Sequence, residues 1–186
     1  MEVAINEEDQ NSLKLTFKNS DIALVNAIRR AVINSVKTYA IDTVTVYKNT
    51  SAMFDEYIAH RIGLIPIETP EKRTEESVLF RLEAKGPVTV YSKDLKSEDP
   101  YVKVANTNIP IIKLGENQEL ILEGKAVLGD AKRHAKFQAA LASYEIKDDS
   151  RIEFYVESFG QMPPKRALKE AIQNIKDEIE DIKKAI

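Results

Sequence analysis

The hydrophobic and polar positions of the first fifty residues predict a strand, a helix and a second strand. Apolar and polar side chains alternate from Leu13 to Lys18, which is typical of a half-buried strand. From Ile22 to about Val36 the apolar residues recur at helical spacing instead, and residues 19–21, Asn-Ser-Asp, offer N-cap candidates. The alternation returns from Asp42 to Tyr47, where β-branched residues favour a second strand.

The stretch from residue 54 to residue 127 predicts one short helix followed by several short strands. A helix from Phe54 to Gly63 would end with Gly63 as its C-cap and carry four apolar residues on one side, Phe54, Tyr57, Ile58 and Ile62. Leu64 to Ile67 leaves it as an extended segment, and residues 69–77 form a polar loop. Strand-like runs follow at 78–83, 88–91, 101–104, 109–113 and 119–127, which is the rhythm of an antiparallel β module.

The last part of the chain predicts a strong strand and a long helix. The strand is Arg151 to Ser158, and Pro163 and Pro164 suit the first turn of the helix that follows. Along this helix apolar residues recur at alternating spacings of four and three, as in a heptad seam, at Leu168, Ile172, Ile175, Ile179, Ile182 and Ile186. A seam of this kind packs lengthwise on another helix, either within the chain or in a partner.

Together these elements predict an α+β protein in which the two ends of the chain enclose a β-rich module. Residues 1–47 and 148–186 form one discontinuous domain, built from strands and two long helices. Residues 48–147 form a mostly antiparallel β domain inserted into it.

Composition and charge then exclude several classes of function. The 186 residues include 43% hydrophobic residues, enough to bury a core, and the net charge of -3 shows no basic excess for direct DNA binding. The chain has no cysteine, which excludes iron–sulfur clusters and cysteine-ligated zinc and favours a reducing cytoplasm. No apolar run is long enough to span a membrane. We therefore expect a cytoplasmic protein without a cofactor.

The candidates for catalysis are the two histidines, His60 and His134, each beside an arginine. Neither lies in a metalloprotease, serine hydrolase or phosphate-binding motif, and two isolated histidines make a catalytic zinc site only if carboxylates complete it. Structural or surface histidines are therefore the favoured interpretation. A small hydrolase centred on either histidine stays the less favoured alternative.

The helix expected at 22–36 offers a better clue to function. Asn26, Arg30 and Asn34 form a polar line at spacings of four, with Arg29 adjacent, and a solvated face would explain them. The apolar residues of the same helix, however, occupy more of its circumference than one sheet face would cover. A second protein is therefore expected on this helix, and a free-standing homodimeric scaffold would use the same surface.

Two segments resemble a known family. DIALVNAIRRAVINSVKTYAID at 21–42 and NTSAMFDEYIAHRIGLIPI at 49–67 are similar to the core of the D subunits of archaeal DNA-directed RNA polymerase. This family is related to the N-terminal domain of the bacterial alpha subunit and to the third-largest subunit of eukaryotic RNA polymerase II. GDAKRHAKFQAALASYEI at 129–146 and the strand and helix from RIEFYVESFG to Ile186 extend the resemblance over nearly the whole chain.

The resemblance implies a non-catalytic assembly platform of DNA-directed RNA polymerase with an alpha-subunit-like dimerisation domain and an inserted β domain. It implies pairing with subunit L and recruitment of the second-largest catalytic subunit and of small zinc-bearing subunits. Besides the six seam residues, the partner interface it implies comprises Asn26, Arg29, Arg30, Glu56, His60 and Arg61. Many family members carry an iron–sulfur domain, which this cysteine-free chain cannot form, and the DNA-binding domain of bacterial alpha is not expected either.

Overall fold

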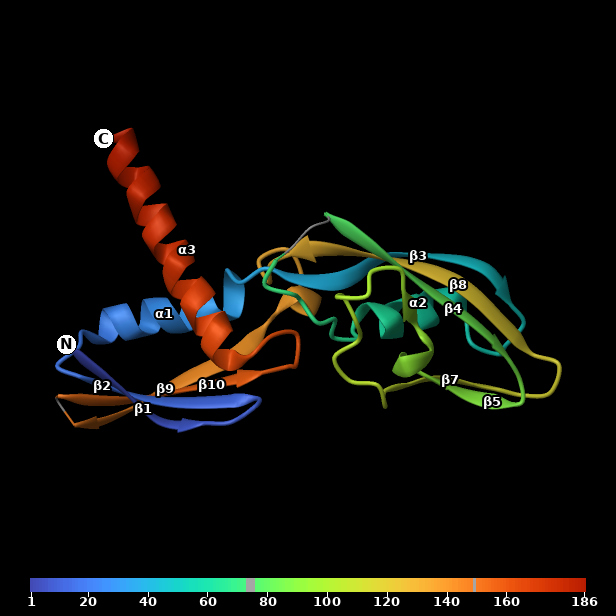
Figure 1. The fold of residues 1–186 in the computed structure, drawn as a ribbon, viewed down its shortest axis with the longest axis horizontal. Coiled ribbons are helices and arrows are strands. Elements are labelled where there is room, and N and C mark those ends of the chain that lie inside the picture. Colours follow the sequence, from blue (N-terminus) through green and yellow to red (C-terminus); the bar gives the residue numbers. More distant parts are fainter. Residues whose placement is uncertain (73–75, 149) are drawn as a thin grey trace. The chain divides into compact units, whose positions relative to one another are not determined.

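The computed structural model describes residues 1–72, 76–148 and 150–186, which form two compact units. Unit 1 combines both ends of the chain, Met1–Lys37 and Asp130–Ile186, and unit 2 is the continuous segment Thr38–Gly129 (Figure 1). Each unit has its own cluster of buried apolar side chains. The predicted α+β class with mostly antiparallel strands is confirmed.

The sheet of unit 1 contains four antiparallel strands in the order β1–β2–β10–β9. Their bounds are Glu2–Glu8 for β1, Ser12–Lys18 for β2, Arg151–Ser158 for β10 and Ala140–Asp148 for β9. The two central strands, β2 and β10, are those that the alternation of the sequence predicts, whereas the edge strands β1 and β9 were not predicted. Strand β1 has no buried side chain, and the buried residues of β9 are the small Ala140 and Ala142, so the alternation in both edges is weaker than in the central strands.

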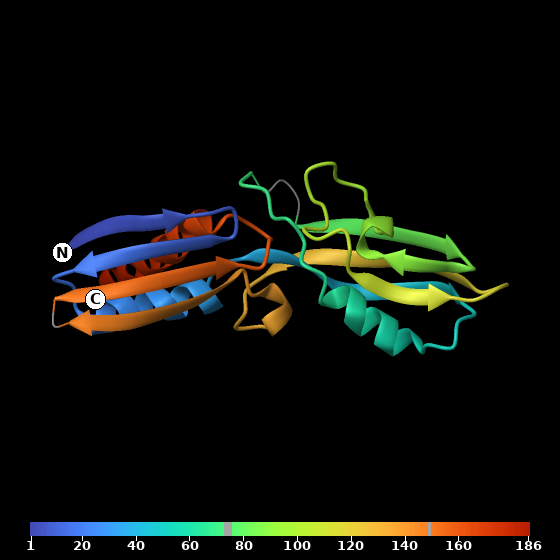
Figure 2. The same ribbon diagram turned by 90° about the horizontal axis from the view of Figure 1, so that it is seen from below.

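The two helices of unit 1, α1 (Ile22–Asn34) and α3 (Pro164–Ala185), cover the same face of this sheet, and the other face is open in Figure 2. Asp21 caps α1, because its carboxylate accepts a hydrogen bond of 2.7 Å from the backbone N–H of Ala23. The side chain of Asn174 on α3 donates to the carbonyl of Ser35 at the end of α1, at 2.7 Å. This bond satisfies an acceptor at the helix end and fixes where α3 crosses α1.

The core of unit 1 lies between the sheet and these helices. On β10 the residues Ile152, Phe154 and Val156 point inward, as their alternation predicts, and they meet Val25, Ile28 and Val32 of α1 in one cluster. Phe154 packs edge to face against Phe17 of β2, with ring centroids 5.7 Å apart. The inner face of the sheet thus accounts for the strict period of two in both central strands.

Unit 2 contains a four-stranded antiparallel sheet and a smaller two-stranded one. The large sheet has the order β3–β8–β4–β6, with bounds Thr38–Asn49, Glu119–Gly129, Ser77–Lys85 and Lys96–Ser97. The small sheet pairs β5 (Val88–Tyr91) with β7 (Pro110–Leu114). The described residues also form two short 3-10 helices, η1 (Ser92–Asp94) in unit 2 and η2 (Ala135–Phe137) in unit 1.

The described part of unit 2 contains one α-helix, α2 (Asp55–Gly63), which packs its buried Ile58 and Ile62 against strands β3 and β7. The helix is not amphipathic in the way the sequence suggests, because Phe54 and Tyr57 lie on its exposed side. It ends at Gly63 as predicted, but Leu64 is its C-cap in place of Gly63, and Phe54 is its N-cap. The expected single apolar side is therefore wrong, and α2 carries apolar residues on two sides.

The boundaries between the units differ from those that the sequence suggests, 47/48 and 147/148. Strand β3 pairs with β8 along its whole length, from Thr38 opposite Gly129 to Asn49 opposite Leu120, so both strands belong to unit 2. Strand β9 pairs with β10 and therefore belongs to unit 1. Backbone pairing between segments far apart in the sequence sets these limits, and hydrophobic patterning along the chain does not record it.

Two further expectations concern the middle of the chain. No strand covers Tyr101–Val104, where only Val104 pairs, in an isolated bridge with Ile67, because the segment is held by turns on either side. The predicted polar loop at 69–77 lies partly outside the described residues, since 73–75 are not among them. The other predicted strands of the middle region correspond to β4, β5, β7 and β8.

An ion cluster connects the end of β3, the start of β8 and the end of β4 in the large sheet of unit 2. Glu119 pairs with Lys48 of β3 and, at 3.3 Å, with Lys85 of β4. Hydrogen bonds from these two ammonium groups hold the pKa of the Glu119 carboxyl below its usual range. The cluster links three neighbouring strands through one carboxylate.

Candidate partner-binding surfaces

The apolar seam of α3 divides into a packed half and an exposed half. Leu168, Ile172 and Ile175 contact the core of unit 1. Ile179, Ile182 and Ile186 continue the same seam but are 47%, 60% and 100% exposed. Figure 1 shows why, because the C-terminal part of α3 extends away from the sheet of unit 1. The first half of the seam thus serves the internal core, and only the second half is available to another molecule.

Further apolar side chains lie exposed on the helix-covered face of unit 1. Val3 and Ile5 of the edge strand β1 stand opposite Phe17 and Leu15, so their side chains point to that same face, and each is half exposed. At the start of α1, Ile22 and Leu24 are also exposed. We call these four residues together with Ile179, Ile182 and Ile186 the apolar margin of unit 1.

Val3 and Ile5 were not among the residues predicted to form an interface. The alternation of Val3 and Ile5 with Glu2, Ala4 and Asn6 is the signal that could have identified them. Large apolar side chains left exposed beside a core are available for a protein-protein interface.

The polar line of α1 has two distinct arginine environments. The guanidinium of Arg29 donates from Nε and Nη2 to Oδ1 of Asn26, at 3.1 and 3.0 Å, which holds both side chains on the helix surface. Arg30 is exposed and makes no hydrogen bond or ion pair with any residue that the structure describes. The two neighbouring arginines therefore differ, since one is positioned by the helix itself and the other is available to a ligand.

Arg30 lines a hollow of about 300 Å³ between α1 and α3. Ala27 and Ala31 leave room for it because their side chains are small, and Ile175 lies beside them. On the other side Lys132 and Glu178 form an ion pair at 3.5 Å. The hollow therefore joins the polar line of α1 to the seam of α3 within unit 1.

The exposed side of α2 is the second candidate surface. Phe54, Tyr57 and Leu64 are 70%, 65% and 52% exposed, at spacings that place them with Arg61 along one side of the helix. Their exposure is the counterpart of the buried Ile58 and Ile62, because a helix cannot turn both sets toward one core. The rings of Phe54 and Tyr57 lie 6.4 Å apart, which places two aromatic groups side by side at the protein surface.

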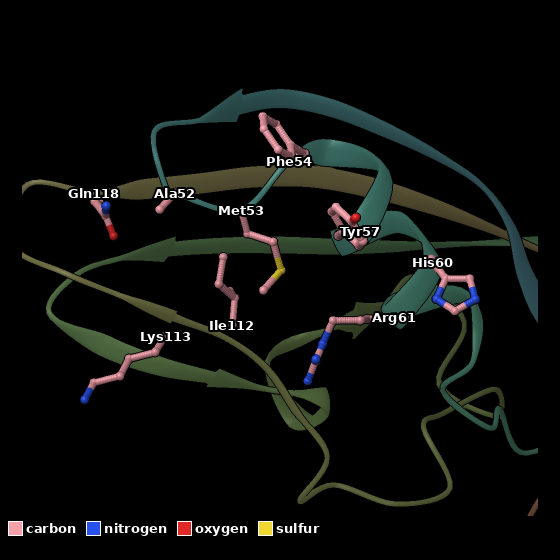
Figure 3. Close-up of a pocket in the computed structure, with 9 residues that line it drawn as sticks. All are labelled: Ala52, Met53, Phe54, Tyr57, His60, Arg61, Ile112, Lys113 and Gln118. Atoms are coloured by element: carbon pink, nitrogen blue, oxygen red, sulfur yellow. The ribbon is translucent and has the colours of Figure 1, made fainter.

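A groove of about 690 Å³ runs between α2, the segment before it and strand β7 (Figure 3). Ala52, Met53 and Ile112 provide apolar lining, and the two aromatic residues lie along the helix side. The remaining lining residues are polar or basic, namely His60, Arg61, Lys113 and Gln118. We call this feature the α2 groove.

Hydrogen bonds position both ends of the α2 groove. Nη2 of Arg61 donates to the carbonyl of Pro110 at 2.6 Å, which ties the helix to the start of β7. At the other end, Oε1 of Gln118 accepts a bond of 2.7 Å from the N–H of Gly115. Gly86 packs against this turn so closely that a Cβ there would lie 1.9 Å from the carbonyl oxygen of Gly115. The groove is thus held by backbone contacts from both of its sides.

The remaining candidate residues contribute less to a site. Glu56 and His60 are exposed on α2, and His60 lines the groove. His134 has a local structural role, because its Nδ1 accepts a hydrogen bond of 3.0 Å from the backbone N–H of Lys136 and caps η2. The two histidines lie in different units. This arrangement gives no support to a hydrolase centred on His134.

The described parts of the chain contain no candidate for a metal site or for a membrane-spanning helix. Within residues 1–72, 76–148 and 150–186, no three acidic or histidine side chains gather closely enough to hold a metal ion. Among the helices that the structure describes, none combines the length and apolarity needed to cross a bilayer.

The chain is similar to RNA polymerase subunits. Residues 40–150 match the family described as the RNA polymerase Rpb3/RpoA insert domain. A relative from Methanocaldococcus jannaschii, the DNA-directed RNA polymerase subunit Rpo3, is 46% identical over 176 residues, which cover 95% of this chain and 88% of the relative.

Relatives of the same name occur in other archaea. The Rpo3 subunit of Pyrococcus furiosus is 45% identical over 153 residues, and that of Halobacterium salinarum is 44% identical over 137 residues. These alignments cover 78% and 73% of this chain but 59% and 55% of the two relatives. The chain therefore spans most of the Methanocaldococcus protein and little more than half the length of the other two.

Proposed function

The chain belongs to the RNA polymerase Rpb3/RpoA family, and we propose that it is a non-catalytic assembly-platform subunit of DNA-directed RNA polymerase. Its similarity to the Rpo3 subunit of Methanocaldococcus jannaschii over nearly the whole chain supports this role. The observation that carries the proposal is the exposed apolar margin of unit 1, which a stable platform must cover with a partner. The role requires neither a catalytic residue nor a cofactor in this chain.

Unit 1 in this proposal is the alpha-subunit-like dimerisation domain, and its partner is subunit L. The apolar margin lies beside the packed core of the unit, so a partner helix laid along Ile179, Ile182 and Ile186 would extend that core. Arg30, with no partner among the described residues, is suited to a carboxylate at the edge of the same interface. Unit 2 is then the inserted domain, in line with the family match at 40–150.

The α2 groove is proposed as the surface that recruits the second-largest catalytic subunit. Most of its lining residues belong to the segment 49–67, which carries the family resemblance, and it presents exposed aromatic residues beside basic ones. Aromatic residues and arginine are enriched at the centres of protein interfaces. The small zinc-bearing subunits of the polymerase are further expected partners, which the proposal does not assign to a particular surface.

The chain expressed alone is expected to self-associate or to be poorly soluble, because the apolar margin of unit 1 is uncovered. Co-expression with subunit L should give a soluble heterodimer. Sedimentation equilibrium of the two preparations measures the difference. A stable monomer with no affinity for subunit L would contradict the proposed role of unit 1.

Substitution of His60 and Arg61 by alanine is expected to weaken recruitment of the second-largest subunit by at least about tenfold. The side chains of His60 and Arg61 line the groove, and the hydrogen bond from Arg61 to the carbonyl of Pro110 connects α2 to β7. The measurement is quantitative capture of the purified second-largest subunit by the heterodimer with subunit L. Equal capture by wild type and the double variant would show that the α2 groove is not the recruiting surface.

Native affinity purification of the tagged chain from an archaeal host tests the proposed function as a whole. Subunit L and the large polymerase subunits should accompany it in fixed ratios. Recovery of the chain as a homodimer without these subunits would support a free-standing scaffold instead.

A further inference from the structure

The α2 groove combines an apolar interior with a basic rim, and this combination restricts what can occupy it. Its volume of about 690 Å³ lies in the range of pockets that enclose drug-sized ligands, so it has room for a few side chains. Met53 and Ile112 form apolar lining, and the exposed rings of Phe54 and Tyr57 offer further apolar contact. A large aliphatic or aromatic side chain is the group that gains most from entering it.

The charges at the groove all have one sign. His60, Arg61 and Lys113 line it, and none of the described residues that line it is acidic. Lys113 is exposed and makes no ion pair with the residues that the structure describes. One N–H of the Arg61 guanidinium donates to the carbonyl of Pro110, and a guanidinium has five N–H donors, so others remain for a ligand. A carboxylate next to the apolar anchor would therefore find the ammonium group of Lys113 on one side of the rim, while the guanidinium of Arg61 keeps the opposite side basic (Figure 3).

We propose that the α2 groove binds a segment of the second-largest polymerase subunit in which a large apolar side chain stands next to an acidic residue. The inference rests on the proposed function and adds the chemistry of the segment that this surface selects. The apolar side chain packs against Met53 and Ile112 and beside the ring of Tyr57, and the carboxylate pairs with Lys113, on the side of the groove away from Arg61 (Figure 3). A nucleic acid strand fits less well, because two permanent cations beside an apolar interior do not form a phosphate-binding stripe.

Two variants test the apolar and the acidic parts of this recognition separately. Ala52→Trp places an indole in the groove, and Ala52 is exposed, so the core of unit 2 is unaffected. Lys113→Glu reverses one rim charge at an exposed position of β7. The matched control is Lys125→Glu, the same charge change at an exposed position of β8 outside the groove.

The assay uses the full-length heterodimer with subunit L and the purified second-largest subunit. Both groove variants should pair with subunit L as wild type does and should bind the second-largest subunit at least about tenfold more weakly, while Lys125→Glu binds normally. Recruitment of the variants at the wild-type level would overturn the inference and leave the proposed function intact. Failure of the wild-type heterodimer to bind the second-largest subunit would overturn the proposed function itself.

A photoreactive benzophenone amino acid at position 113 then identifies the occupant in the reconstituted polymerase. The expected cross-linked peptide belongs to the second-largest subunit and contains Phe, Tyr, Leu, Ile or Met within two residues of Asp or Glu. Cross-links to nucleic acid, to a zinc-bearing subunit, or to a peptide without an acidic residue would each overturn the inference. Restored binding between Lys113→Glu and a second-largest subunit whose identified carboxylate is changed to lysine would support the direct pairing.

Discussion

Replacement of Ile179 and Ile182 by glutamate is expected to weaken pairing with subunit L by at least about 100-fold. Both side chains belong to the exposed half of the α3 seam and are 47% and 60% exposed in the isolated chain. Full burial of an isoleucine contributes about 1.5 to 3 kcal/mol, and a buried unpaired carboxylate adds a desolvation cost. Titration calorimetry with purified subunit L measures the change.

Two controls separate pairing from folding. Glu180 and Lys183 form an exposed ion pair on the same part of α3. Replacing both by Gln should change the affinity for subunit L by no more than about 0.5 kcal/mol. Ala in place of Leu168, in the packed half, should lower the stability of unit 1 instead. If the charge control and the isoleucine variant weaken pairing equally, the seam is not the contact.

The sequence predicts one continuous interface seam along α3, whereas Ile179 and Ile182 belong to its exposed half only. The sequence alone would recommend Ile175 and Ile179 as the pair to replace. In the structure, Ile175 already contacts the core of unit 1, so its replacement would mix loss of stability with loss of pairing. The exposed residues beyond it give the cleaner test.

Phe154→Ala is expected to destabilise unit 1 by about 3 to 5 kcal/mol. The side chain is 1% exposed on the central strand β10 and packs edge to face on Phe17. Hydrogen exchange should show lost protection in Met1–Lys37 and Asp130–Ile186, with Thr38–Gly129 retaining its protection, because each unit has a core of its own.

Phe80→Ala is the matched control, since Phe80 is fully buried in the core of unit 2. It should produce the opposite pattern, with protection lost in unit 2. Loss of protection in both units after either substitution would show that the two cores unfold as one cooperative system.

Local patterning was most informative where an element has one buried face. The central strands β2 and β10 and the helix α1 follow the predicted periods because each packs one side against the core of unit 1. The edge strands β1 and β9 expose most of their side chains, so the pattern that identifies a strand is weak there. Helix α2 has a comparable difficulty, because its exposed apolar residues resemble core residues in the sequence.

The candidate site residues show the same division. The segments that carry Arg29, Arg30, His60 and Arg61 could be recognised from the sequence by their resemblance to a family, and membership of that family is confirmed. Their environments could not be inferred, because only the structure shows that Arg29 is half-buried and bonded to Asn26 while Arg30 is exposed. The α2 groove could not be inferred either, because Ile112 and Lys113 of β7 form part of its lining and lie about fifty residues further along the chain.

The sequence by itself determined the α+β class, the main helices and central strands, the absence of cysteine chemistry and the family. These properties depend on residue identity and on short periods, which are set by the geometry of a strand or a helix. Only the tertiary structure decided which half of the α3 seam is packed, where unit 2 begins and which apolar residues of α2 face solvent. The physical reason is that burial depends on which distant segments meet, and local periodicity does not specify those contacts.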